Sequence, residues 1–248
     1  MKILLLFISL FCVHFTIRAQ TVEEIITKYT AARGGIEKLK AIKTIHMEGS
    51  CIQFGKLFKL VKNIENKKFY RADQILTHNT FSTVINSDGV WHVINKKAKK
   101  IPDSIAYNYQ YRLDIEGSLV DYISKGHKVE LLGKDTATGG QQCYKIKFTS
   151  NIGVEIIYWI DTVNYFKVQS SIMERSMIPN KYGELESRQM LKDVIFYKNY
   201  KNINGIIFPY VELMNMYNEK GELVNTINTY YEIIEIDKPL KPRVYKLK

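Results

Sequence analysis

Histidine, cysteine and acidic residues are the side chains of this sequence that would support catalysis or metal binding. Four histidines follow the N-terminal segment, and none has another histidine two or four positions away: His46, His78, His92 and His127. The chain contains no H-E-x-x-H, C-x-x-C, G-x-S-x-G or phosphate-binding loop motif. The spacing therefore predicts no metal site and no nucleophilic centre. We expect a protein that is not an enzyme and that has no cofactor.

Glu184 and Glu186 come closest to a catalytic acid pair. In an extended strand they would share a face about 6.6 Å apart, near the separation in inverting glycosidases. They follow Tyr182-Gly183, and acids in such a setting are more typical of a solvated loop. A hydrolase with an unrecognised site is therefore the least favoured alternative.

The first nineteen residues have the pattern of a secretory signal peptide. Met1-Lys2 precedes an apolar run from Ile3 to Ile17. As a helix this run would measure about 22 Å, which is short of the roughly 30 Å bilayer core. We expect cleavage after Ala19 and export to the periplasm, with a signal anchor as the alternative. Phe11 before Cys12 is too large for a lipobox.

Residues 20–248 would then form the mature protein, which we expect to be a single domain. The removed segment holds two basic residues and no acidic one, so the formal charge falls from +11 to +9. Export would permit a disulfide between Cys51 and Cys143. Both lie in strand-like runs far apart in sequence, and the geometry of the fold decides whether two cysteines pair. The sequence therefore leaves open whether this disulfide forms.

The composition favours a compact β-rich protein with a basic surface. Apolar residues make up 46%, and 17 Tyr and 11 Phe favour strands. Lys alternates with aromatic residues in three runs, as in sheets that stack nucleic-acid bases: 67–71, 143–148 and 196–201. Strand alternation also places Lys in solvent, so we expect no nucleic-acid partner. The charge suits an anionic membrane or acidic lipid head groups, or is that of ordinary solvated lysines.

The hydrophobic period divides the chain into a helical start and a long β region. Thr21 and Glu24 form a capping box before an apolar face that ends at Gly34-Gly35. From Thr44 onward the period is two, and short turns such as Ser87-Asp88-Gly89 favour an antiparallel meander. Strands are predicted over 44–54, 57–64, 67–74, 80–86, 90–95, 128–134, 141–149, 153–160, 165–175, 188–200, 206–217 and 222–236.

The interval 103–125 interrupts the strands and predicts a pair of helices that covers the sheet as a lid. Ile105, Tyr109 and Leu113 recur at helical spacing, Gly117 breaks the pattern, and a second apolar series resumes after it.

Too few helices are predicted to cover the apolar face of so large a sheet. Eleven strands would be roughly 50 Å wide, whereas a helix covers about 10 Å. The sheet should therefore curl on itself and enclose either its own side chains or a space for an apolar guest. The fold class expected is mainly β (α+β), a half-open antiparallel barrel of about 11 strands with an N-terminal helix and a helical lid.

Four segments resemble the LolA-like family of bacterial outer-membrane lipoprotein-sorting proteins: Tyr29–Thr44, Leu132–Phe148, Tyr158–Asp161 and Tyr197–Pro209. The resemblance extends from about Thr21 to Ile236, and it rests on a helix cap, turn glycines and strand aromatics. It implies an open barrel with a helical lid that carries acyl chains of lipoproteins, or other lipids, through the periplasm. The family's release arginine cannot be aligned with Arg71 or with any other arginine of this sequence, so its role is not carried over.

A periplasmic carrier that shelters lipid on its way to the outer membrane is the function that the sequence favours. Its partners would be lipoprotein acyl chains or other lipids, with donor and acceptor proteins in the two membranes. The alternative is a lipid- or lipoprotein-sensing module that reports to a membrane partner. The lid residues expected to contact lipid are Leu113, Leu119 and Ile123. The expected cavity wall is Tyr144, Ile146, Phe148, Ile156, Tyr158, Phe166 and Val168.

Overall fold

Two short helices precede the sheet in the computed structural model, which describes residues 20–179 and 185–247. The expected signal peptide and Glu184 lie outside this part. Helix α1 (Val22–Ala32) begins at the predicted capping box, in which the Glu24 amide donates to Thr21 Oγ1 at 3.2 Å. Its apolar face is buried, and α2 (Ile36–Ala41) follows after Gly34-Gly35.

All strands belong to one antiparallel sheet of thirteen. Twelve were predicted, with small shifts at their ends. The expected count of about eleven is too low, partly because β6 is a short edge strand whose sequence, KAKK, carries no apolar alternation. The strands are β1 (Thr44–Gln53), β2 (Lys56–Glu65), β3 (Phe69–Leu76), β4 (Asn79–Asn86), β5 (Gly89–Ile94), β6 (Lys97–Lys100), β7 (Lys128–Thr136), β8 (Gln142–Thr149), β9 (Glu155–Asp161), β10 (Lys167–Pro179), β11 (Leu185–Ile203), β12 (Ile206–Tyr217) and β13 (Leu223–Ile236).

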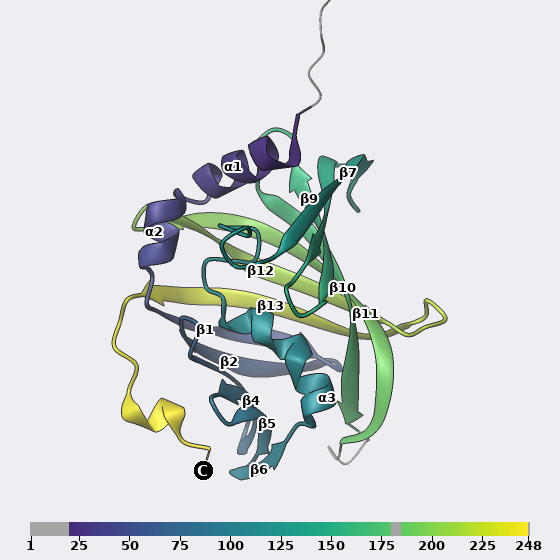
Figure 1. Cartoon of the computed structure of the whole chain (residues 1–248). Helices are drawn as coiled ribbons and strands as arrows, with labels where there is room; N and C mark the ends of the chain where they lie inside the picture. Colours follow the sequence, from purple (N-terminus) through teal and green to yellow (C-terminus); the bar gives the residue numbers. More distant parts are fainter. Residues whose placement is uncertain (1–19, 180–184, 248) are drawn as a thin grey trace, which may run out of the picture.

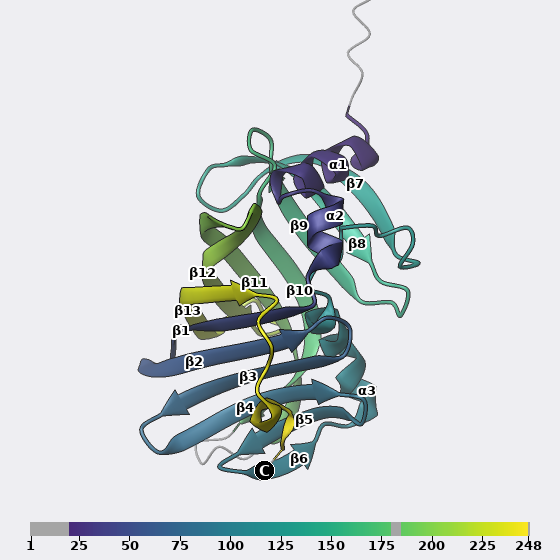
Figure 2. The same cartoon turned by 90° about the vertical axis from the view of Figure 1, so that its left-hand side faces the viewer.

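The sheet curls into a half-open barrel, with α1 and α2 across one end (Figures 1 and 2). The strand order is β6-β5-β4-β3-β2-β1-β13-β12-β11-β10-β9-β8-β7, so the first strand pairs with the last. The two free edges, β6 and β7, are consecutive in sequence. Residues 101–127, which we call the lid segment, connect these edges.

The lid segment is less helical than expected. It contains α3 (Asp103–Ala106) and a 3-10 helix, η1 (Tyr107–Leu113), but residues 118–126 form turns instead of the predicted second helix. Gly117 and Asp121 have φ values of 92° and 50°. A right-handed helix cannot continue through such left-handed residues, so the apolar spacing after Gly117 did not produce a helix. Ile123 consequently has 71% of its surface exposed.

The outer face of β3–β5 is covered by the C-terminal segment, which contains a short 3-10 helix, η2 (Pro242–Tyr245). Phe69, Val84 and Val93 form a buried cluster on which Val244 and Leu247 pack. Arg71 donates to the carbonyl of Lys246 at 2.6 Å and pairs with Asp73 at 2.8 Å. Arg71 therefore anchors the C-terminal segment.

Cys51 and Cys143 are free, buried thiols, so the possible disulfide does not form. They lie on β1 and β8, with five strands between these two in the sheet. Burial raises the pKa of Cys143 to about 11, which leaves little of the reactive thiolate at neutral pH.

Thiol labelling should report on folding. In a chain that begins at residue 20, we expect a maleimide to label neither cysteine of the folded protein within minutes and both of them in strong urea. Rapid labelling without denaturant would contradict the burial of both sulfur atoms.

Candidate functional site

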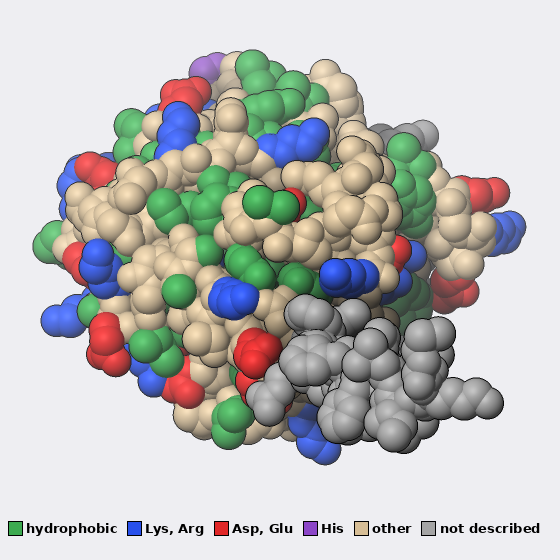
Figure 3. Space-filling model, turned by 90° about the horizontal axis from the view of Figure 1, so that it is seen from above, with side chains coloured by type: hydrophobic (Ala, Val, Ile, Leu, Met, Phe, Trp, Pro, Cys, Tyr) green, Lys and Arg blue, Asp and Glu red, His purple; other side chains and the backbone are tan. Residues whose placement is uncertain are grey.

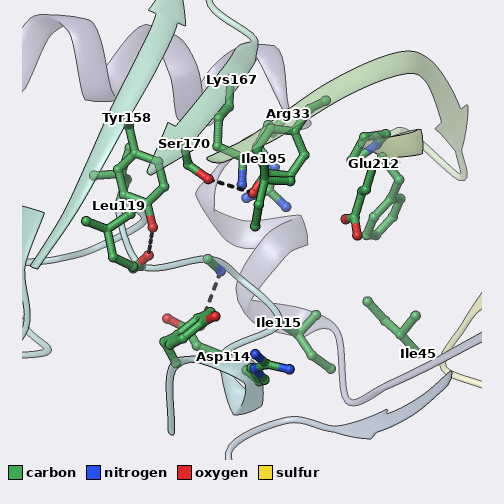
Figure 4. Close-up of a pocket in the computed structure, with 18 of the residues that line it drawn as sticks. Arg33, Ile45, Asp114, Ile115, Leu119, Tyr158, Lys167, Ser170, Ile195 and Glu212 are labelled. Carbon is green, nitrogen blue, oxygen red and sulfur yellow. Dashed lines mark hydrogen bonds between the residues drawn. The ribbon is translucent and has the colours of Figure 1, made fainter. Parts of the chain in front are cut away.

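A cavity of about 260 Å³ lies inside the barrel beneath the lid segment. One side is formed by β1–β3, the other by β9–β12, and the end of α1 and residues 111–119 complete the wall (Figure 4). The inner faces of the strands supply apolar side chains by simple alternation. The apolar wall comprises Ile45, Met47, Ile64, Ile115, Leu119, Ile156, Phe166, Ile172, Ile195, Phe208 and Pro209.

The lid segment is tied to the barrel by polar contacts. The hydroxyls of Ser118 and Tyr158 are 2.6 Å apart, and Arg33 donates to the carbonyl of Glu116 at 2.6 Å. The buried carboxylate of Glu116 also pairs with Lys67 and Lys125, at 3.1 and 3.0 Å. The roof of the cavity is therefore attached to α1, to β9 and to the turn after β2.

Charged side chains also line the cavity, and cations outnumber acids. The cations are Arg33, Lys62, Arg112 and Lys167, and the acids are Asp114 and Glu212. Asp114 pairs with Lys125 at 2.8 Å, while Glu212 accepts from the Tyr231 hydroxyl at 3.2 Å. The wall is thus amphipathic rather than uniformly apolar.

Lys62 belongs to the polar group around Glu212. Its ammonium donates to the Tyr231 hydroxyl and lies 5.0 Å from the centre of that ring. Burial disfavours its charge, but the neighbouring Tyr231 and Glu212 outweigh burial and raise the pKa of Lys62 above its usual value. Lys62 therefore keeps its charge, which Tyr231 and Glu212 partly offset.

The side chain of Arg112 extends from the lid segment toward two buried acids, Glu174 on β10 and Asp193 on β11. It lies 3.7 Å from Glu174, beside Asp193. Burial, and then the adjacent Glu174, raise the pKa of Asp193 to about 7. Among the described residues, Arg112 Nε, Glu174 Oε2 and Asp193 Oδ1 have no hydrogen-bond partner. One guanidinium therefore faces two carboxyl groups, and the raised pKa of Asp193 lets it keep a proton up to about neutral pH.

Lys167 lies against the aromatic side chains of the cavity wall. Its ammonium lies over the rings of Tyr197 and Tyr158, 3.8 and 5.5 Å from their centres. Within the described part of the chain it forms no ion pair. Burial, and then the charge of Arg33, lower the pKa of Lys167 to about 8, against an opposing effect of Glu212.

Four of the residues named from the sequence line the cavity: Leu119, Ile156, Tyr158 and Phe166. Three others are buried in the main core and do not face the open space: Tyr144, Ile146 and Phe148. Of the lid residues, Leu113 is half-buried against the core, whereas the exposed Ile123 covers nothing. Wall and core residues share one face of the sheet, so alternation alone does not separate them.

Val168 lies on the opposite face of the sheet, contrary to expectation. It packs with Cys143 and Trp159 in a small outer cluster. Lys167 pairs with Ile160 and Gln169 with Trp159, so β10 has one extra residue at Val168. This β-bulge turns Val168 outward and Lys167 inward.

The cavity cations Arg33 and Lys167 were not predicted from the sequence. Regular alternation from Phe166 to Val168 would place Lys167 in solvent, as it does the lysines of β8. The only sequence signal for Arg33 is its position just before Gly34-Gly35, where α1 ends over the barrel.

No group of three or more potential metal ligands gathers among residues 20–179 and 185–247. Within those ranges, no helix is long and apolar enough to cross a bilayer. On the described part of the face seen from above, Lys and Arg side chains are scattered among acidic and apolar ones (Figure 3). The positive charge is therefore not gathered into one patch on that face.

A half-open antiparallel barrel with an internal cavity under a lid is the architecture that these observations define. A solved LolA superfamily protein from Nitrosomonas europaea is similar over 92% of this chain and 98% of its own, with a TM-score of 0.56 and 12% identity. The resemblance to the LolA-like family is confirmed at the level of the fold.

Other comparisons add little to this result. A DUF1329 family protein from Desulfovibrio piger also covers 92% of this chain and 98% of its own, with a TM-score of 0.47 and 11% identity. No family model matches the sequence, and no curated protein does.

Proposed function

We propose that this protein is a periplasmic carrier that binds an acyl chain of a lipoprotein or another lipid in its cavity and moves it toward the outer membrane. The observation that carries the proposal is the cavity of about 260 Å³ with an apolar wall under the lid segment. Burying an acyl chain gains about 0.8 kcal/mol per CH₂, so binding needs no catalytic group. The signal-peptide pattern and the fold support export and lipid binding.

The cavity volume limits what the protein can carry without a movement of the lid segment. At about 30 Å³ per water-sized group, it has room for roughly nine such groups. One short chain, or one segment of a longer chain, therefore fits, and two full chains require the lid segment to move.

Native mass spectrometry of protein purified from the periplasm tests the proposal. We expect a mass excess that disappears on organic extraction and matches a lipid in the extract. Protein that never carries lipid but copurifies with a membrane protein in a fixed ratio would instead identify the sensing module.

Filling the cavity should abolish uptake of an apolar probe. Ile195 faces the space, so Ile195→Trp would occupy part of it (Figure 4). We expect the affinity for an apolar fluorescent dye to fall at least about tenfold, because the indole takes the place of the guest. Val194→Trp on the other face of β11 is the matched control and should keep the affinity. Equal dye binding by both folded variants would contradict the assignment of this cavity.

A further inference from the structure

Two cations face the same part of the cavity without an acid between them. Arg33, at the end of α1, and Lys167, at the bulge of β10, converge beside Ser170 (Figure 4). The hydrogen bonds of Arg33 go to the neutral Tyr29 hydroxyl and the Glu116 carbonyl, at 3.2 and 2.6 Å. Neither cation forms an ion pair among the described residues, whereas Lys125, Lys67 and Arg112 each meet a carboxylate there.

This arrangement costs free energy in the empty protein. Arg33 and Lys167 are half-buried. A charged group partly removed from water is destabilised unless an opposite charge compensates it, and two like charges add repulsion. The tyrosine rings beneath Lys167 compensate only in part, because a cation–π contact is weaker than an ion pair in a dry site. An anion at this point would offset both effects.

The apolar wall continues away from this pair of cations. Ile45 and Ile115 lie at the far side of the cavity from Lys167 and Arg33 (Figure 4). A ligand that suits both ends has a charged head and an apolar tail, and the cavity volume allows about one short chain.

We propose that the cavity is built for a single-chain anionic amphiphile, whose carboxylate or phosphate head group is bound by Lys167 and Arg33 while its chain lies against the apolar wall. The inference rests on the proposed function and names the class of lipid. Ser170, whose hydroxyl is 2.9 Å from that of Tyr197, offers a neutral hydrogen-bond donor to the same head group.

Matched ligands separate this inference from the proposed function. We would measure binding of decanoate, decyl phosphate, decanol and inorganic phosphate to the chain from residue 20 by calorimetry at pH 7. Both anionic amphiphiles should bind at least about tenfold more tightly than decanol. Inorganic phosphate should neither bind measurably nor displace decanoate.

The source of the preference is tested by Lys167→Met, which keeps the length of the side chain and removes its charge. Decanoate affinity should fall about 10- to 100-fold, and decanol affinity should not fall. Lys201→Met is the matched control, because Lys201 also lies over a tyrosine ring, 4.1 Å from the centre of Tyr210, but is exposed outside the cavity. It should change neither affinity.

The pH dependence gives an independent readout. The charged and titratable groups that face Lys167 are Arg33, Glu212, Tyr158 and Tyr197. A bound anion stabilises the ammonium, so decanoate affinity should be constant from pH 6.5 to about 8 and then decline by up to about tenfold per pH unit. The decline should vanish in Lys167→Met.

Each result has one meaning. Equal binding of decanoate and decanol by the unaltered protein would overturn the head-group site and leave lipid binding intact. Failure of all three amphiphiles to bind would overturn the proposed function itself. Displacement of decanoate by inorganic phosphate would reveal an anion site that needs no apolar chain. That result would contradict the proposal that the ligand is an amphiphile. Unchanged decanoate affinity in Lys167→Met, or an equal loss in Lys201→Met, would refute the specific role of Lys167.

Discussion

Replacing Phe148 by alanine should lower the free energy of unfolding by about 3–5 kcal/mol, as large truncations in a packed core do. The side chain has 1% of its surface exposed on the inner face of β8. Its ring meets those of His127 and Tyr158 edge-on, with centroids 5.0 and 6.2 Å away. The substitution would leave a void between the sheet and the end of the lid segment.

Urea unfolding followed by tryptophan fluorescence measures this loss. Ile123→Ala is the control within the lid segment, and it should shift the free energy by less than about 0.5 kcal/mol because Ile123 is exposed. A loss below about 1 kcal/mol for Phe148→Ala would show that Phe148 borders open space instead of packed side chains.

Asp193→Asn should stabilise the protein above neutral pH. The folded-state pKa of Asp193 is raised from 3.8 to about 7, so the folded protein keeps a proton that the unfolded chain releases near pH 4. The contribution of this group to stability is therefore fully present below about pH 4 and is lost as the pH rises through 7. The amide mimics the protonated acid at every pH. At pH 8 the variant should be more stable by on the order of 4 kcal/mol.

The two unfolding free energies, measured from pH 4 to pH 8, check this expectation. They should agree near pH 4 and separate as the pH rises. Asp88→Asn in the exposed turn between β4 and β5 is the control and should run parallel to the unaltered protein. Parallel curves for Asp193→Asn would mean that Asp193 is ionised in the folded state at neutral pH.

The strands were predictable because their signals are local. Alternating apolar residues and turn chemistry identified twelve of the thirteen strands and the antiparallel order of neighbours. The curl was also predictable, since three helices cannot cover so wide an apolar face. The pairing of β1 with β13 was not foreseen, because nothing within either strand specifies a partner so distant in the chain.

The cavity was harder to predict than the fold. One extra residue at Val168 exchanges the faces of Val168 and Lys167, and no turn residue marks the bulge. The lid segment shows a similar limit, because Asp121 adopts a left-handed conformation that the spacing of Leu119, Val120 and Ile123 does not reveal. In both places a single residue departs from the regular strand or helix period. These two departures determine which side chains line the cavity wall and how the lid segment folds above it.

The junction between β1 and β13 determines how the chain can reach its final form. Every other neighbouring pair of strands in the sheet is consecutive in sequence, so each of the two sheet halves can assemble by short, fast hairpin closures. The junction brings together residues 194 positions apart, as between Lys43 and Asp237, and its loop-closure entropy opposes early formation. Formation of this junction should therefore be the late, slow step of folding, in which the two halves of the sheet come to enclose a common interior.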